Sequence, residues 1–253
     1  MARERSERVL RDERSRSTRD LRDAAEARRG DTRPFEARLR RPPDGRLRVI
    51  AEVKKASPSA GVLRSDFDPA GIAAAYEAAG AAAISVLTEP ARFLGSMEHL
   101  ASVRARVTLP VLAKDFVIHE RQIYEARAHG ADAILLIVAL LSGPQLTDYA
   151  ALSREVGLEP LLEAFDERDL ERAWELPGVV GVNNRDLHTF ATNLETSVRL
   201  ADKLKRVLAV SESGLRCSED LTRLESLGYR AFLIGEQLLT AEDPEKALQA
   251  LLR

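Results

Sequence analysis

The stretch Ile50-Ala-Glu-Val-Lys-Lys-Ala-Ser-Pro-Ser-Ala-Gly61 joins an apolar strand to a turn and carries charged side chains between them. Residues 49–53 are rich in strand formers, and the Ser-Pro-Ser that follows is typical of a turn. Glu52 and Lys54 are two positions apart, and side chains on a strand alternate between its faces, so both charges point the same way. A surface ion pair is one explanation, and a polar site at the end of the strand is the other.

Three later apolar runs also end on an ionisable or amide side chain. They are Val111-Leu-Ala-Lys114, Pro160-Leu-Leu-Glu163 and Val180-Gly-Val-Asn183. A rim salt bridge would explain any one of these residues alone. Lysine and glutamate are rarely buried unless they are paired, so their recurrence at successive strand ends favours one shared site.

From residue 49 onward, short apolar strands alternate with helical stretches. Four glycines, each ending a helix just before a strand, recur at intervals of 50, 48 and 50 residues: Gly80, Gly130, Gly178 and Gly228. Four such repeats of two strand–helix units predict eight strands. A doubly wound open sheet would need a glycine-rich dinucleotide turn after the first strand, and residues 56–61 do not form one. The sequence therefore predicts a parallel (β/α)8 barrel, the TIM barrel of the α/β class, over residues 47–253.

The bulk composition describes a soluble, cytoplasmic protein. The chain has 253 residues, 45% of them hydrophobic, and a net charge of −2, so nothing overall indicates nucleic-acid binding. Cys217 is the only cysteine, which excludes an internal disulfide. The charged amino terminus does not resemble a signal peptide, and the longest apolar run, residues 133–141, is too short to span a bilayer.

Residues 1–46 are expected to form an Arg-rich, helical N-terminal extension. Residues 1–48 hold sixteen arginines, no lysine and ten acidic residues. Within residues 1–30, Val9, Leu10 and Leu21 offer only a thin apolar stripe, so we expect a solvated helix with many charge pairs that shares little core with the barrel, and partial disorder is the alternative.

Barrels of this kind carry their active sites at the carboxyl ends of the strands. The predicted mouth receives Glu52, Lys54, Lys114, Glu163, Asn183 and residues 211–213, the last following a seventh strand predicted at residues 207–211. The glycines of Ser213-Gly214 and Gly235-Glu236 would let backbone N–H groups approach a phosphate, to which Ser57 could contribute. Ordinary glycine turns, and a plain turn serine before Pro58, are the alternatives.

The sequence gives no sign of a metal or a cofactor. The four histidines lack metal-ligand spacing, and the single cysteine has no partner. Lys54 or Lys114 could in principle form a Schiff base, although no signature for one is present.

Seven motifs, in the same order along the chain, resemble the indole-3-glycerol phosphate synthase family. They are Ile50-Ala-Glu-Val-Lys-Lys-Ala-Ser-Pro-Ser59, Ser85-Val-Leu-Thr-Glu89, Lys114-Asp-Phe116, residues 133–141, Gly181-Val-Asn-Asn-Arg-Asp-Leu187, Ser211-Glu-Ser-Gly214 and Phe232-Leu-Ile-Gly235. The resemblance covers residues 49–253. It implies a lyase of tryptophan biosynthesis that closes the indole ring of 1-(2-carboxyphenylamino)-1-deoxyribulose 5-phosphate with loss of carbon dioxide and water.

The resemblance also implies roles for individual residues. Lys114 would be the general acid that protonates the substrate ketone, and Glu163 and Lys54 an acid/base pair for the later dehydration, with the assignment of acid and base left open. The remaining residues would bind and polarise the substrate: Glu52, Asn183, Arg185, Phe93, Phe116 and Ser213, with Ser57, Gly214, Gly235 and Glu236 at the phosphate. An amino-terminal helix would help to cover the active site.

Two other functions stay open. Another phosphate-binding barrel enzyme, such as a sugar-phosphate isomerase, would lack the set of Lys54, Lys114 and Glu163. A binding protein could use the Arg-rich extension on an acidic partner or nucleic acid, with a steep salt dependence, although the interleaved acidic residues argue against it. The expected partner is a small phosphorylated substrate, without nucleic acid or membrane, for a monomer or a weak homodimer.

Overall fold

The computed structural model describes residues 17–40, 45, 47–58, 60–186, 189, 191–205 and 207–252. Val9 and Leu10 of the expected apolar stripe lie outside these residues. Within the described ranges, no helix combines the length and the apolar character that crossing a membrane requires.

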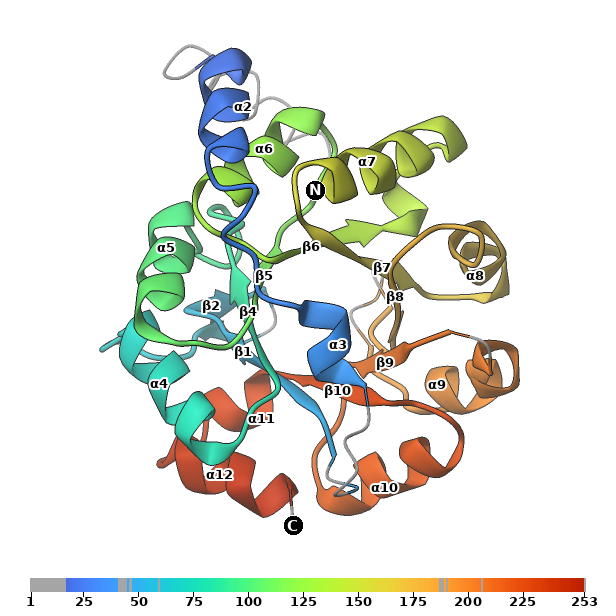
Figure 1. The fold of residues 1–253 in the computed structure, drawn as a ribbon. Helices are drawn as coiled ribbons and strands as arrows, with labels where there is room; N and C mark the ends of the chain where they lie inside the picture. The colour runs from blue at the N-terminus through green and yellow to red at the C-terminus, as the bar shows by residue number, and fades with distance from the viewer. Residues whose placement is uncertain are drawn as a thin grey trace.

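A closed barrel of eight parallel strands forms the centre of the described chain (Figure 1). The strands are β1 (Val49–Val53), β4 (Ala83–Leu87), β5 (Val111–Lys114), β6 (Ala133–Ile137), β7 (Glu159–Ala164), β8 (Val179–Asn183), β9 (Ala209–Glu212) and β10 (Ala231–Ile234). Each pairs in parallel with the next along the chain, and β10 closes the ring onto β1. The predicted (β/α)8 barrel is therefore confirmed.

Helices surround the barrel between successive strands (Figure 1). They are α4 (Pro69–Ala79), α5 (Met97–Arg106), α6 (Glu120–Ala128), α7 (Gly143–Glu155), α8 (Glu167–Ala173), α9 (Glu195–Leu200), α10 (Ser218–Ser226), α11 (Glu236–Leu239) and α12 (Pro244–Leu251), with 3-10 turns η1 (Val138–Leu140) and η2 (Ala201–Leu204). The first follows the sequence pattern closely: Asp68 caps α4 by accepting the Gly71 N–H at 3.1 Å, and Gly80 ends it at φ 98°. A proline at the first position and a left-handed glycine after the last are the usual signals.

Two apolar layers hold the barrel together. Side chains that face the barrel axis, such as Ile50, Leu112 and Leu161, form an inner cluster, and those that face the helices form an outer one. Both faces of each strand are buried, which explains why the strand sequences are nearly continuous apolar runs. One feature of the first loop was not predicted: β2 (Ala56–Ser57) and β3 (Gly61–Val62) pair as a small antiparallel hairpin.

The described part of the N-terminal extension shares more core with the barrel than expected. Helix α2 (Thr18–Glu26) packs against α6 and buries Leu21 and Ala25 in the outer cluster. Helix α3 (Phe35–Leu39) lies across the centre of the barrel in Figure 1 and inserts two fully buried side chains into the inner cluster. The expectation of little shared core concerned residues 1–30, and the burial of Leu21 and Ala25 goes against it for residues 17–30. Helix α3 lies outside the range of that expectation.

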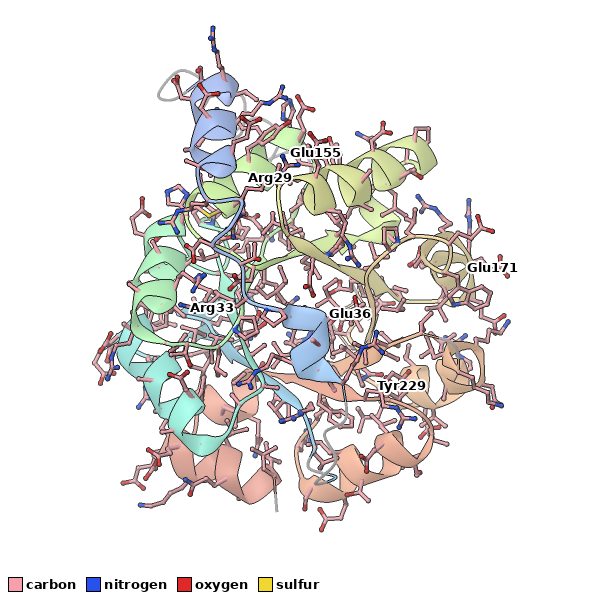
Figure 2. All side chains as sticks on the ribbon, viewed as in Figure 1. Arg29, Arg33, Glu36, Glu155, Glu171 and Tyr229 are labelled. Carbon is pink, nitrogen blue, oxygen red and sulfur yellow. The ribbon has the colours of Figure 1, made fainter. Side chains whose placement is uncertain are left out.

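Buried arginines attach this segment to the amino-terminal end of the barrel. Arg127 donates to the carbonyl oxygens of Arg28 and, at 2.6 Å, Asp31, and Arg104 Nη2 pairs with the Asp31 carboxylate at 2.9 Å. The backbone N–H of Arg33 donates to Asp132 Oδ1 at 2.8 Å, just before β6 (Figure 2). Residues 28–39 therefore close the end of the barrel opposite the strands' carboxyl ends. The resemblance implied a helix over the active site, and no described residue of the extension takes that place.

Candidate active site

A cavity of about 290 Å³ lies at the carboxyl ends of the barrel strands. Every residue to which the family resemblance gave a role, except Ser57, lines it: Glu52, Lys54, Phe93, Lys114, Phe116, Glu163, Asn183, Arg185, Ser213, Gly214, Gly235 and Glu236. Ser57 is buried in the β2–β3 hairpin, where its hydroxyl accepts the Ala60 N–H at 3.2 Å. Of the mouth residues 211–213, Ser211 does not line it, because its hydroxyl bonds to Asn184 behind the wall. The structure thus brings together residues that are up to 184 positions apart, from Glu52 to Glu236.

Lys114 lies at the centre of the charged side chains. Its Nζ is 3.5 Å from Glu163 Oε2 and 3.7 Å from Glu212 Oε2. Burial alone would lower the pKa of this ammonium, but the negative charges of Glu163, Glu212 and Glu52 outweigh burial and raise the pKa above its ordinary value. Lys114 is therefore protonated at neutral pH, as a proton donor must be.

Glu52 and Lys54 form a second ion pair beside it. Lys54 Nζ donates to Glu52 Oε1 at 2.7 Å, and both side chains are almost completely buried. Burial opposes ionisation of Glu52, yet the charges of Lys54 and Lys114 outweigh it and lower the pKa of this carboxyl. The alternation of β1 explains the pairing, since residues two apart on a strand face the same side.

Glu212 belongs to the predicted mouth residues 211–213, and it is a buried member of the site to which the sequence assigned no role of its own. It is the last residue of β9, only 1% exposed, and it lines the cavity. Burial and the neighbouring negative charge of Glu163 raise the pKa of its carboxyl to about 8, against the opposing effect of Lys114. The available signal was its spacing: Val210, two positions earlier, faces the barrel axis, so Glu212 must face it too.

Two glycines leave the space that these carboxylates occupy. A Cβ at Gly181 on β8 would stand 2.1 Å from Glu212 Oε1, and a Cβ at Gly235 would stand 2.3 Å from Glu52 Oε1. Carbon and oxygen atoms do not approach this closely without a bond, so any larger residue would displace the carboxylate. Both glycines therefore shape the charged centre without contributing a side chain.

Two aromatic side chains form an apolar wall of the cavity. The ring centroids of Phe93 and Phe116 are 6.3 Å apart at an interplanar angle of 48°. Buried carboxylates hold the loops that carry them: Glu89 accepts the Phe93 N–H at 3.3 Å, and Asp115 accepts the Phe116 N–H at 2.7 Å. An aromatic ring of a ligand would find suitable partners here.

The wall formed by β8, β9 and β10 is polar. Asn183 Oδ1 accepts the Arg185 N–H at 2.9 Å, and Arg185 Nη2 pairs with Glu236 Oε2 at 3.3 Å. Ser213 and Gly214 follow β9 with φ values of 66° and 80°, and Gly235 follows β10 at the start of α11. Loops in these positions commonly hold phosphate in barrels of this type.

A closed parallel barrel whose lysines and glutamates meet in a cavity at the carboxyl ends of the strands defines an enzyme of the (β/α)8 class. The family model described as "Indole-3-glycerol phosphate synthase" matches residues 1–251. The chain belongs to the indole-3-glycerol phosphate synthase family.

Individual relatives agree with the family model. The chain is 50% identical over 220 residues to the indole-3-glycerol phosphate synthase of Carboxydothermus hydrogenoformans, covering 86% of this chain and 83% of the relative. It is 52% identical over 208 residues to that of Salinibacter ruber, covering 81% and 77%.

A solved structure supports the fold. The chain superposes with a TM-score of 0.61 on a chain from work on the tryptophan synthase a2b2 complex of Pyrococcus furiosus, covering 81% of this chain and 97% of that one. At 16% identity, that likeness bears on the fold alone.

Proposed function

We propose that the cavity closes the indole ring of 1-(2-carboxyphenylamino)-1-deoxyribulose 5-phosphate, with Lys114 as the general acid. Family membership makes the chain a carboxy-lyase of tryptophan biosynthesis. The observation that carries the residue assignment is the set of Lys54, Lys114 and Glu163 in one cavity beside an aromatic wall. This set offers an acid for a ketone, a further acid/base pair, and a surface for an aromatic ring.

Ring closure begins when the aryl carbon that bears the carboxylate attacks the ketone carbon of the sugar chain. Negative charge develops on the ketone oxygen, and the Lys114 ammonium supplies a proton to it. The raised pKa of Lys114 does not prevent this transfer, because the alkoxide that forms is more basic than an amine. Loss of carbon dioxide then returns the electron pair to the ring.

Dehydration completes the indole. The hydroxyl that ring closure created must leave with a proton, and a proton must be removed from the neighbouring carbon. Glu163 and Lys54 are the pair we assign to these transfers, with both orders of acid and base open. Their separate ion pairs, Glu163 with Lys114 and Lys54 with Glu52, keep each side chain in a fixed position.

The other cavity residues bind the substrate in this proposal. Phe93 and Phe116 contact the aromatic ring, and Glu52 and Asn183 position and polarise the reacting atoms. Arg185 supports the site and Ser213 contacts the substrate. Gly214, Gly235 and Glu236 hold the phosphate from the cavity wall, while Ser57 acts there through the hairpin. No cofactor is assigned to the reaction.

We further propose a cytoplasmic enzyme that is a monomer or a weak homodimer and binds neither nucleic acid nor membrane. Two arginines of the described extension bond to the barrel: Arg29 donates to Glu155 O at 2.9 Å and Arg33 to Leu109 O at 2.8 Å (Figure 2). Others pair with acidic residues of the extension itself, as Arg22 does with Glu26. This use of arginine argues against an acidic partner. The exposed large apolar side chains of the described chain, Val62, Leu94, Trp174 and Leu227, are few, which favours weak self-association at most.

The direct test is the appearance of indole fluorescence when the anilino substrate is added to the purified protein. We expect turnover without an added cofactor. A folded protein that produces no indole but interconverts sugar phosphates would instead support the isomerase alternative.

A further inference from the structure

A buried amide lies directly behind the cavity wall. Asn184 is 2% exposed and does not line the cavity, although its neighbour Asn183 does. Its Nδ2 donates to Ser211 Oγ at 3.0 Å, to Glu212 O at 3.0 Å and to Ser213 O at 3.1 Å. One side chain on the segment after β8 thus contacts three successive residues at the end of β9.

The residues it holds form an unfavourable turn. Ser213 has φ 66° and Gly214 has φ 80°, both in the left-handed region. Glycine adopts this region readily, but a serine there is disfavoured by contact between its Cβ and the backbone. The turn must therefore be stabilised from outside, and the hydrogen bond from Asn184 to the Ser213 carbonyl provides such a contact.

The Asn184 amide is itself fixed in orientation. Its Oδ1 accepts the Ser197 N–H at 3.0 Å, while its Nδ2 faces oxygens, so rotating the amide by half a turn would break both sets of contacts. The Ser197 and Ser211 hydroxyls are 2.8 Å apart, and Tyr229 donates its hydroxyl to Ser197 O at 2.9 Å (Figure 2). These residues are buried, so the network is rigid and shielded from water.

We propose that Asn184 is a positioning residue that presents the Ser213–Gly214 turn to the phosphate of the substrate. This inference rests on the proposed function, in which that turn binds phosphate. Asn183 and Asn184 then have different tasks: the first faces the substrate, and the second fixes the wall that holds it. Glu212 depends less on the amide, because its carbonyl also accepts the Asn184 backbone N–H at 2.9 Å.

The test compares Asn184→Ala and Asn184→Asp with Tyr229→Phe as the matched control. The alanine variant removes every side-chain contact, whereas the aspartate variant keeps the shape and the acceptor for Ser197 but loses the donors. Tyr229→Phe removes one buried hydrogen bond from the same network without touching the turn. For each folded variant, the measurements are KM, kcat, melting temperature and the affinity for inorganic phosphate by calorimetry.

We expect both Asn184 variants to raise KM and to weaken phosphate binding by about tenfold or more, with a smaller change in kcat. Tyr229→Phe should lower the melting temperature but keep KM and phosphate affinity within about twofold of the parent. Phosphate affinity and KM near the parent values in folded Asn184 variants would overturn the proposal. Failure of both variants to fold would show a structural role and would overturn it as well.

A failure of the proposed function would give a different experimental result from a failure of the Asn184 proposal. A parent protein that binds phosphate but does not turn over the anilino substrate would contradict the assigned reaction. The effect of Asn184 on phosphate affinity would remain measurable in that case, because calorimetry does not depend on turnover.

Discussion

Gly181 leaves room for the Glu212 carboxylate, because a Cβ on the glycine would stand 2.1 Å from the Oε1 atom of the glutamate. The two residues lie on neighbouring strands, β8 and β9. Leu161 Cδ1 would be 3.3 Å from the same Cβ, so the added methyl group has no free space. The space that Gly181 leaves, by lacking a side chain, thus fixes the position of the Glu212 carboxyl group.

Gly181→Ala should therefore displace the Glu212 carboxylate and loosen its pairing with Lys114. We expect kcat to fall by about tenfold or more, because Lys114, the proposed acid, would lose one of the side chains that fix its position. Gly143→Ala is the control, since a Cβ at Gly143 would meet nothing within 4 Å. Equal kcat for the parent and Gly181→Ala would show that the position of Glu212 does not affect the reaction.

The raised pKa of Glu212, about 8, predicts how stability depends on pH. The folded state holds a proton on this carboxyl more tightly than the unfolded chain, where a glutamate has a pKa of about 4.3. Its contribution to stability is thus fully present below about pH 4.3 and is lost as the pH rises through about 8. Glu212→Gln keeps the neutral shape at every pH.

We therefore expect the melting temperature of Glu212→Gln, relative to the parent, to increase between about pH 5 and pH 8. Thermal melts in matched buffers across this range check the trend. A difference that stays constant with pH, or that falls as the pH rises, would mean that Glu212 is ionised throughout.

Phe35 should be structural rather than catalytic. It is fully buried in the inner cluster at the amino-terminal end of the barrel, away from the cavity. Removing a buried phenylalanine typically costs about 3–5 kcal/mol, so Phe35→Ala should lower the unfolding free energy by that order. Leu227→Ala, at an exposed position, should cost little. Urea melts combined with kinetics check both points, and a large change in KM for folded Phe35→Ala would link α3 to the active site.

Much of the site was predictable because strand geometry is simple. The alternation of β1 places Glu52 and Lys54 on one face, and the parallel barrel brings the carboxyl ends of all strands to one mouth. Lys114 and Glu163 each end an apolar run. Once the number and order of the strands were predicted, the barrel geometry placed both side chains at the same mouth. The regular spacing of glycines such as Gly80 and Gly130 predicted the fold, because one such glycine ends every second helix.

Two features differ from the sequence-based predictions, each for a physical reason. The seventh strand is predicted at residues 207–211 but lies at Ala209–Glu212, so the sequence places Glu212 at the mouth without showing that it ends the strand. Phe35 and Leu39 are four residues apart, as on one face of a helix. They pack into the amino-terminal end of the barrel, and a local sequence pattern cannot predict such a long-range contact. The role of Ser57 at the phosphate stays a prediction, because the β2–β3 hairpin turns its hydroxyl toward Ala60 and Ser57 does not line the cavity.

Lys114→Ala tests the central claim, that Lys114 is the acid of ring closure. General acid catalysis typically contributes about 10²–10⁴-fold, so kcat should fall by at least that order. KM should change less, because other residues hold the phosphate in the proposed function. Lys114→Arg should restore little activity, since a guanidinium gives up its proton far less readily than an ammonium. Lys203→Ala is the control for a simple salt bridge, because Lys203 pairs with Glu167 at 2.6 Å on the surface.

The decisive measurement is kcat and melting temperature on one preparation of Lys114→Ala. The account predicts a folded protein whose kcat is reduced by about 10²-fold or more, beyond anything that Lys203→Ala produces. A folded Lys114→Ala protein with kcat within a few-fold of the parent would contradict the account and remove Lys114 from the mechanism.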